Sequence, residues 1–170
     1  MKSLDLNEGK LWLRRRGLQD YEMFLHGTIR VAHRRCLVPT EGRDGLSVFD
    51  LARFFHAQLP TTEEALIWIV EKGPYTEAEE MQLFDAYMTY MAMTSKACIM
   101  FDRQDGHAFV AVMAMCLLFR WDFGLIDNKA ELLAIHSHDN GLGIFRVPEE
   151  MLEALSTLGF AKEKESGSSS

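Results

Sequence analysis

Two helix-start signals lie close together in the middle of the chain, and they constrain its fold more than any other feature. Residues 61–64 (Thr-Thr-Glu-Glu) and 76–79 (Thr-Glu-Ala-Glu) each have the pattern of a capping box. In this motif a threonine side chain and an acid three residues later satisfy backbone N–H groups that a helix start leaves free. Apolar residues follow both boxes, and a Gly-Pro pair ends the first segment. The sequence therefore predicts one helix over 61–73 and a second over 76–91.

Apolar spacing predicts further helices on both sides of this pair. Residues 18–36 place apolar side chains at three- and four-residue steps, which puts them on one face of a helix. Ser47 is a suitable N-cap for a helix that ends before Pro60, and Pro148 suits the first turn of another helix. The apolar run 108–119 fits a buried helix or a buried strand, although its Ala, Met and Leu content favours a helix.

One β-hairpin is indicated near the C-terminus. Two segments, 132–138 and 142–147, flank an Asp-Asn-Gly turn, and Asn-Gly readily adopts the positive φ angles of a tight hairpin. The expected fold is mainly α, a compact bundle of five or six helices with this C-terminal hairpin. The alternative is α+β with a small antiparallel sheet. We expect residues 1–161 to form a single globular domain and the polar residues 162–170 to form a flexible tail.

Composition indicates an ordinary intracellular protein. The chain has 170 residues, of which 48% are apolar, and this suits one domain with its own hydrophobic core. Its three cysteines, Cys36, Cys98 and Cys116, form no CxxC pair, which favours reduced thiols in a cytosol. Residues 1–10 lack the apolar run of a secretory signal, and the run 108–119 is too short to span a bilayer. We therefore expect a cytoplasmic protein that does not enter a membrane.

Charge is distributed unevenly along the chain. Residues 1–53 hold ten Lys/Arg and seven Asp/Glu, a net of +3, whereas residues 54–170 hold eight and eighteen, a net of −10. Several basic side chains fall in the N-terminal arm or on the helix expected over 18–36. They are Arg14, Arg15, Arg16, His26, Arg30, Arg34 and Arg35. We predict that they form a contact surface for an acidic protein partner, or for the phosphates of a nucleic acid.

Residues 136–138 (His-Ser-His) form the most distinctive chemical motif. On a strand, residues two apart point to the same side, so both imidazoles can reach one metal ion. The motif resembles the His-x-His core of JAMM-type metalloproteases. In that family an aspartate ligand follows eleven residues after the second histidine, and here Glu149 holds that position, while the family's serine is replaced by Arg146. The resemblance implies a zinc site of His136, His138 and Glu149 in a metal-dependent hydrolase.

Other catalytic patterns are absent from the sequence. It has no GxGxxG, P-loop, GxSxG or HExxH motif. The function that we expect is therefore non-catalytic: a cytosolic regulator, inhibitor or adaptor that binds another macromolecule, in the first place a protein, without a cofactor. A homodimer is compatible with the charge pattern. The two alternatives are a zinc-dependent hydrolase that uses the His-x-His site and a nucleic-acid-binding protein that uses the basic helix face.

Overall fold

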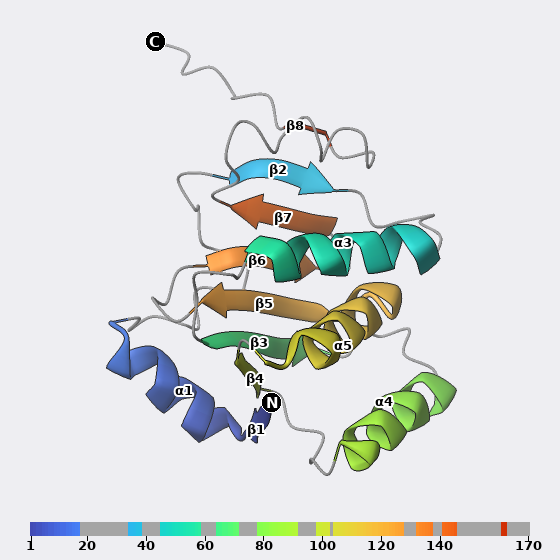
Figure 1. Cartoon of the computed structure of the whole chain (residues 1–170). Helices are drawn as coiled ribbons and strands as arrows, with labels where there is room; N and C mark the ends of the chain where they lie inside the picture. Colours follow the sequence, from blue (N-terminus) through green and yellow to red (C-terminus); the bar gives the residue numbers. More distant parts are fainter. Residues whose placement is uncertain are drawn as a thin grey trace.

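The chain forms an α+β fold in which an antiparallel sheet carries helices on both faces (Figure 1). In this computed structural model the described residues are 1–17, 34–38, 45–58, 64–71, 78–91, 98–102, 104–127, 132–137, 141–145 and 161–162. The described helices are α1 (Leu6–Arg15), α3 (Gly45–Gln58), α4 (Ala78–Tyr90) and α5 (Gly106–Leu118). The strands are β1 (Lys2–Leu4), β2 (Arg34–Val38), β3 (Glu64–Glu71), β4 (Cys98–Asp102), β5 (Asp122–Asp127), β6 (Leu132–Ser137), β7 (Gly141–Phe145) and β8 (Ala161–Lys162).

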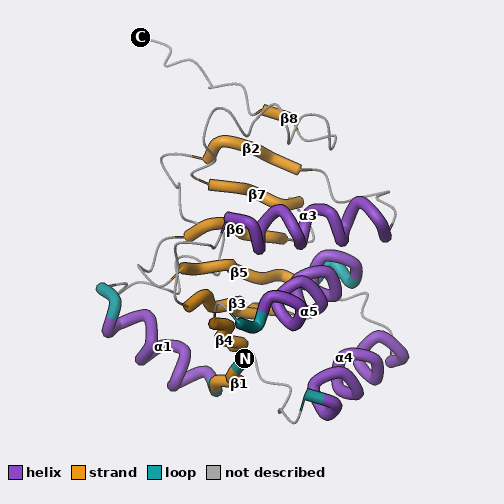
Figure 2. Tube along the Cα trace, in the orientation of Figure 1, coloured by secondary structure: helices purple, strands orange, loops and turns teal. Residues whose placement is uncertain are grey.

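The strand order of the sheet does not follow the chain. The order is β1-β4-β3-β5-β6-β7-β2-β8, as the stacked strands of Figure 2 show. β3 lies between β4 and β5, and every pairing is antiparallel. β2 comes from the N-terminal third of the chain, yet it pairs with β7 and β8 from the C-terminal third. The two ends of the chain are therefore joined in one sheet.

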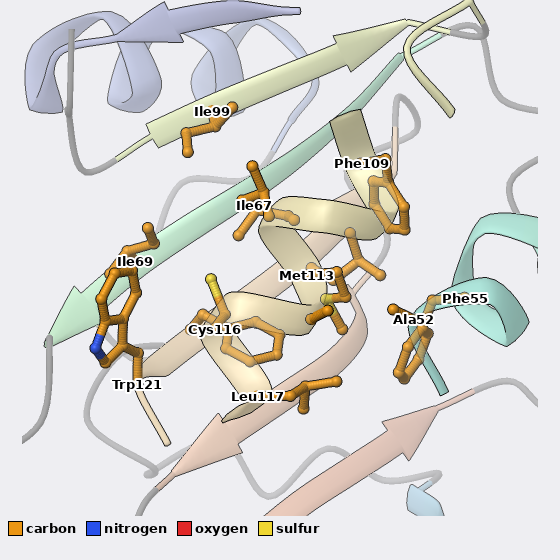
Figure 3. Close-up of a cluster of buried hydrophobic side chains, with 14 of the residues drawn as sticks. Ala52, Phe55, Ile67, Ile69, Ile99, Phe109, Met113, Cys116, Leu117 and Trp121 are labelled. Atoms are coloured by element: carbon orange, nitrogen blue, oxygen red, sulfur yellow. The ribbon is translucent and has the colours of Figure 1, made fainter. Parts of the chain in front are cut away.

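Alternate residues of the central strand β3 face two separate apolar clusters. The odd-numbered residues of 65–69 point into the larger cluster, which also contains buried side chains of α3, α4 and α5. The even-numbered residues point the other way, into a smaller cluster with Trp12 of α1. Figure 3 shows part of the larger cluster, where Trp121 and Phe55 lie on opposite sides of α5. The sheet is thus buried on both faces along β3.

The expected bundle of five or six helices with a single hairpin is wrong. Residues 64–71, which fall in the helix predicted over 61–73, form the central strand β3. Their Ile, Trp and Val side chains suit a strand. Because both faces of β3 are covered, its sequence is a continuous apolar run without alternation, which does not distinguish strand from helix. The alternative, α+β with a small antiparallel sheet, has the right class but too small a sheet.

Several expected elements are present. Helix α4 begins near the second capping box. Helix α3 covers the predicted segment, but it begins at Gly45, so Ser47 lies inside the helix and is not its N-cap. The apolar run 108–119 is a helix, since α5 covers almost all of it. The predicted hairpin is confirmed as β6 and β7. It is not isolated, because β6 also pairs with β5 and β7 with β2.

The helix expected over 18–36 is contradicted at its C-terminal end, where residues 34–36 belong to β2. Residues 18–33 lie outside the described residues, as does the helix expected to begin at Pro148. Of the expected tail over 162–170, only Lys162 is described, and it belongs to β8. The single domain over residues 1–161 stays a prediction.

Two helices end in the same left-handed turn but with different residues. After α1 this position is Gly17, with a φ of 88°, and after α5 it is Arg120, with a φ of 56°. The Arg120 N–H donates to the Leu117 carbonyl at 3.2 Å. The Trp121 N–H donates to the Cys116 carbonyl at 2.9 Å, which completes a Schellman motif. Glycine is usual at this position because a side chain there costs about 1–2 kcal/mol. The turn leads directly from α5 into β5.

Candidate functional site

Helix α1 is fixed at its start and along its inner face. At its start, a capping box joins Asp5 and Glu8: each carboxylate accepts a hydrogen bond from the other residue's backbone N–H, at 2.8 and 2.7 Å. Along its inner face, Gly9, Trp12 and Leu13 are buried, and both large side chains belong to the smaller apolar cluster with β3 and β4. The helix therefore presents its outer side chains from a firmly held backbone.

Among the exposed side chains of α1, three lie together in its C-terminal half, and we call them the α1 basic end: Leu11, Arg14 and Arg15. Leu11 is 47% exposed, and both arginines are exposed. Arginines near a helix C-terminus interact favourably with the helix dipole, so they stabilise α1 even without a partner. Leu11, which lies beside them, gains no such stabilisation from its exposure to water. Arg14 and Arg15 belong to the predicted basic surface, whereas Leu11 was not among the residues predicted for it.

Arg16 is engaged within the molecule. Its guanidinium donates to Glu64 Oε2 at 2.6 Å and lies 3.9 Å from the centroid of the Trp12 ring. The Trp12 indole N–H donates to the same carboxylate oxygen at 3.2 Å. These contacts tie the end of α1 to the start of β3. Among the three consecutive arginines that the sequence groups together, Arg16 therefore has a structural role.

The strand order separates two other predicted basic residues from the α1 basic end. Arg34 and Arg35 lie on β2, four strands away from β3 in the sheet. Neighbouring strands are about 4.8 Å apart, so roughly 19 Å separates β2 from β3. The expected basic helix face is wrong for these two residues, because their backbone is extended. His26 and Arg30 lie outside the described residues.

His136 is a buried core residue. It is 1% exposed, and its ring stacks on Phe123 of β5 with centroids 5.5 Å apart and planes at 13°. Its Nδ1 lies 2.7 Å from the Trp121 carbonyl oxygen. Because a carbonyl oxygen only accepts hydrogen bonds, Nδ1 carries a proton and donates it here. His136 thereby ties β6 to the turn that follows α5.

The predicted metal site stays a prediction, because only one of its three residues is described. His138 and Glu149 lie outside the described residues. Within the described segments, no group of three His, Cys, Asp or Glu side chains could hold a metal ion. His136 also shares its side of β6 with Ala134, which belongs to the larger apolar cluster. Its ring therefore lies on the side of the sheet that the helices α3 and α5 cover.

Replacing His136 with alanine is expected to lower the free energy of unfolding by about 2 kcal/mol. The buried Trp121 carbonyl loses its donor, and Phe123 loses a stacked ring. A His136→Phe variant keeps the ring without the donor, so its loss should be smaller. Chemical denaturation with and without added zinc measures the free energy of unfolding of the native protein and of both variants. If zinc stabilised the native protein but neither variant, the role of His136 would not be purely structural.

Cys98 and Cys116 are not set up for nucleophilic chemistry. Cys98 and Cys116 are both buried and form no disulfide. Burial raises the pKa of Cys98 to about 12, and the nearby carboxylates of Asp5 and Glu8 contribute to the rise. The thiolate is the reactive form of cysteine. Cys98 is therefore protonated and unreactive at neutral pH.

A second exposed face, on α4, has no counterpart among the site residues predicted from the sequence. The inner side of α4 is anchored by Phe84, whose ring meets Trp121 edge-on at 4.8 Å. Beside it, Leu83 is 56% and Tyr90 is 84% exposed. Together with Tyr87 they lie on one side of the helix. In the sequence these apolar residues adjoin the positions that face the core, so a wider buried face is the simplest interpretation. Their spacing alone therefore does not reveal that they are exposed.

The chain matches no protein-family model, no curated protein and no solved structure. None of the helices in the described segments has the length and apolar character needed to cross a membrane. The exposed faces of α1 and α4 are therefore the features from which a function can be inferred.

Proposed function

We propose that the protein is a non-catalytic cytosolic adaptor or regulator that binds an acidic surface of another protein through the α1 basic end. The observation that carries this proposal is the exposure of Leu11 beside Arg14 and Arg15, on a helix whose other side is buried. Protein interfaces are enriched in arginine and contain apolar side chains surrounded by polar ones. The α1 basic end has this composition.

The charge of the whole chain favours a protein partner over a nucleic acid. The formal net charge is −7, so a long polyanion would be repelled by most of the surface. An acidic patch on a protein is smaller and can meet the two arginines without approaching the acidic part of the chain. The contacts of Arg16 with Glu64 and Trp12 hold the last turn of α1 in place. Little backbone freedom is then lost when a partner binds.

The cytosolic location is supported by the cysteines. Cys98 and Cys116 form no disulfide. Cysteines without disulfides are typical of proteins in a reducing compartment. The location is part of the proposal, and it implies that the partner is also exposed to the cytosol.

Reversing the charge of the α1 basic end is expected to abolish partner capture. In the Arg14→Glu, Arg15→Glu variant, recovery of a partner should fall by more than about tenfold, since truncating a central interface residue often costs that much. The measurement is quantitative affinity capture from a nuclease-treated cell lysate. The matched control is Lys2→Glu with Arg53→Glu, because both residues are exposed and the change in net charge is the same.

The two variants separate the outcomes. Thermal unfolding of each variant should match that of the native protein, which shows that the fold is intact. Equal recovery of the same proteins by the arginine variant and the control would show that the α1 basic end is not the contact surface. A partner that disappears on nuclease treatment would point to nucleic-acid binding and overturn the proposal.

A further inference from the structure

One side of α4 carries an exposed apolar stripe. Leu83, Ala86, Tyr87 and Tyr90, which we call the α4 stripe, occupy positions i, i+3, i+4 and i+7 and therefore line one side of the helix. Leu83, Ala86 and Tyr90 are exposed and Tyr87 is half-buried. Single exposed apolar side chains are ordinary, but contiguous ones mark contact surfaces. At 84%, Tyr90 is the most exposed large hydrophobic residue in the described part of the chain.

The α4 stripe is supported from beneath by the core. Phe84 and Met88, on the neighbouring side of the helix, are almost completely buried, and Phe84 packs on Trp121. Tyr87 and Tyr90 are three positions apart and therefore lie on adjacent turns of α4. Burial raises the pKa of Tyr87, and the nearby Tyr90 raises it further. Tyrosine offers a large contact area with few rotatable bonds, which keeps the entropy cost of binding low. The stripe therefore combines a rigid base with side chains suited to an interface.

The charges on α4 indicate what kind of partner fits. The helix contains Glu79, Glu80 and Asp85 and neither lysine nor arginine. Glu79 is exposed and lies one turn before Leu83, which places it at the N-terminal end of the α4 stripe. Asp85 is exposed on another side of the helix. Interfaces pair opposite charges around their apolar centres, so the complementary surface is basic as well as apolar.

We propose that the α4 stripe binds a basic amphipathic helix of a partner protein. The apolar side chains of that helix would lie along Leu83, Tyr87 and Tyr90, and a lysine or arginine would pair with Glu79. A straight row of exposed side chains on one helix suits packing against a second helix, because side-chain ridges of one helix pack into grooves of the other. This surface is separate from the α1 basic end and opposite to it in charge. The protein then has two docking faces, one for an acidic and one for a basic partner.

The test uses a synthetic amphipathic helical peptide of leucine and lysine, labelled for fluorescence anisotropy and titrated with the full chain. The Leu83→Ser, Tyr90→Ser variant should bind it more than about tenfold more weakly, as expected when central interface residues are truncated. Glu79→Lys should also weaken binding. The matched control is Leu6→Ser with Phe49→Ser, which removes two exposed apolar side chains on other helices and should leave the affinity unchanged. The same peptide with glutamate in place of lysine should not bind.

Each contrary outcome overturns the proposal. Equal affinity of the native chain and the Leu83→Ser, Tyr90→Ser variant would show that the peptide binds elsewhere. Equal affinity for the lysine and glutamate peptides would show that charge does not contribute to binding. Self-association of the native chain in sedimentation experiments, lost in the same variant, would show that a second copy occupies the α4 stripe. None of these variants alters the α1 basic end, so failure here is distinguishable from failure of the proposed function.

Discussion

Replacing Trp121 with alanine is expected to lower the free energy of unfolding by about 3–5 kcal/mol, the usual cost of removing a large aromatic side chain from a core. Trp121 is completely buried and lies between α5 and β5. Its ring meets Phe84 of α4 at 4.8 Å and Phe119 at 5.7 Å. The alanine variant therefore loses both the core volume and the aromatic contact that anchors α4.

Chemical denaturation measures the total loss, and hydrogen exchange shows where it falls. Amides of α4 should lose more protection than those of α1, because α1 packs in the smaller apolar cluster. A Trp121→Phe variant keeps an aromatic ring near Phe84 and should lose less stability. A change below about 1 kcal/mol in the alanine variant, which is ordinary for a surface site, would contradict the assignment of Trp121 to the core.

The second large effect is expected at Gly9. A β-carbon placed there would lie 2.6 Å from Cys98 Sγ and 3.1 Å from Trp68 Cζ3. Alanine normally stabilises a helix by about 1 kcal/mol relative to glycine, but overpacking a core costs about 1–3 kcal/mol. Valine adds a larger branched side chain at the same point. We expect Gly9→Val to lower the free energy of unfolding by about 3 kcal/mol.

A double-mutant cycle identifies the cause of this loss. Cys98→Ala removes the sulfur atom nearest to the added side chain. In that background Gly9→Val should cost less than it does in the native chain, because part of the required space is already free. Denaturation of the four proteins gives the coupling between the two sites. Equal costs in both backgrounds would show that contact with Cys98 is not the source of the effect.

Elements with local signals were predictable from the sequence, and elements decided by their neighbours were not. The capping box before α4, the Asn-Gly turn of the β6–β7 hairpin and the composition of α5 each have a local physical cause. For β3 the same reasoning fails, because residues 64–71 are apolar throughout and only burial on both faces makes them a strand. Helix α1 did have a local signal, the Asp5–Glu8 capping box, that the prediction overlooked.

In the candidate site, too, local features were predictable from the sequence and contacts with distant residues were not. The exposure of Arg14 and Arg15 follows from their position on the side of α1 opposite to its buried face, which sequence spacing can indicate. The engagement of Arg16 could not be foreseen, because its partner Glu64 is 48 positions away in the chain. The α4 stripe was visible as a row of apolar residues. Its exposure depends on where α4 sits in the fold, and sequence spacing does not specify that.

The place of β2 in the sheet has a consequence for how the chain is made. Its partner β7 is translated roughly a hundred residues later, which at about 5–20 residues per second means a wait of about 5–20 seconds. Until then β2 emerges from the ribosome with both of its hydrogen-bonding edges open, and open edges readily pair with other chains. Slowing translation between β2 and β7 should therefore lower the yield of native protein, whereas a chaperone that shields extended segments should restore it.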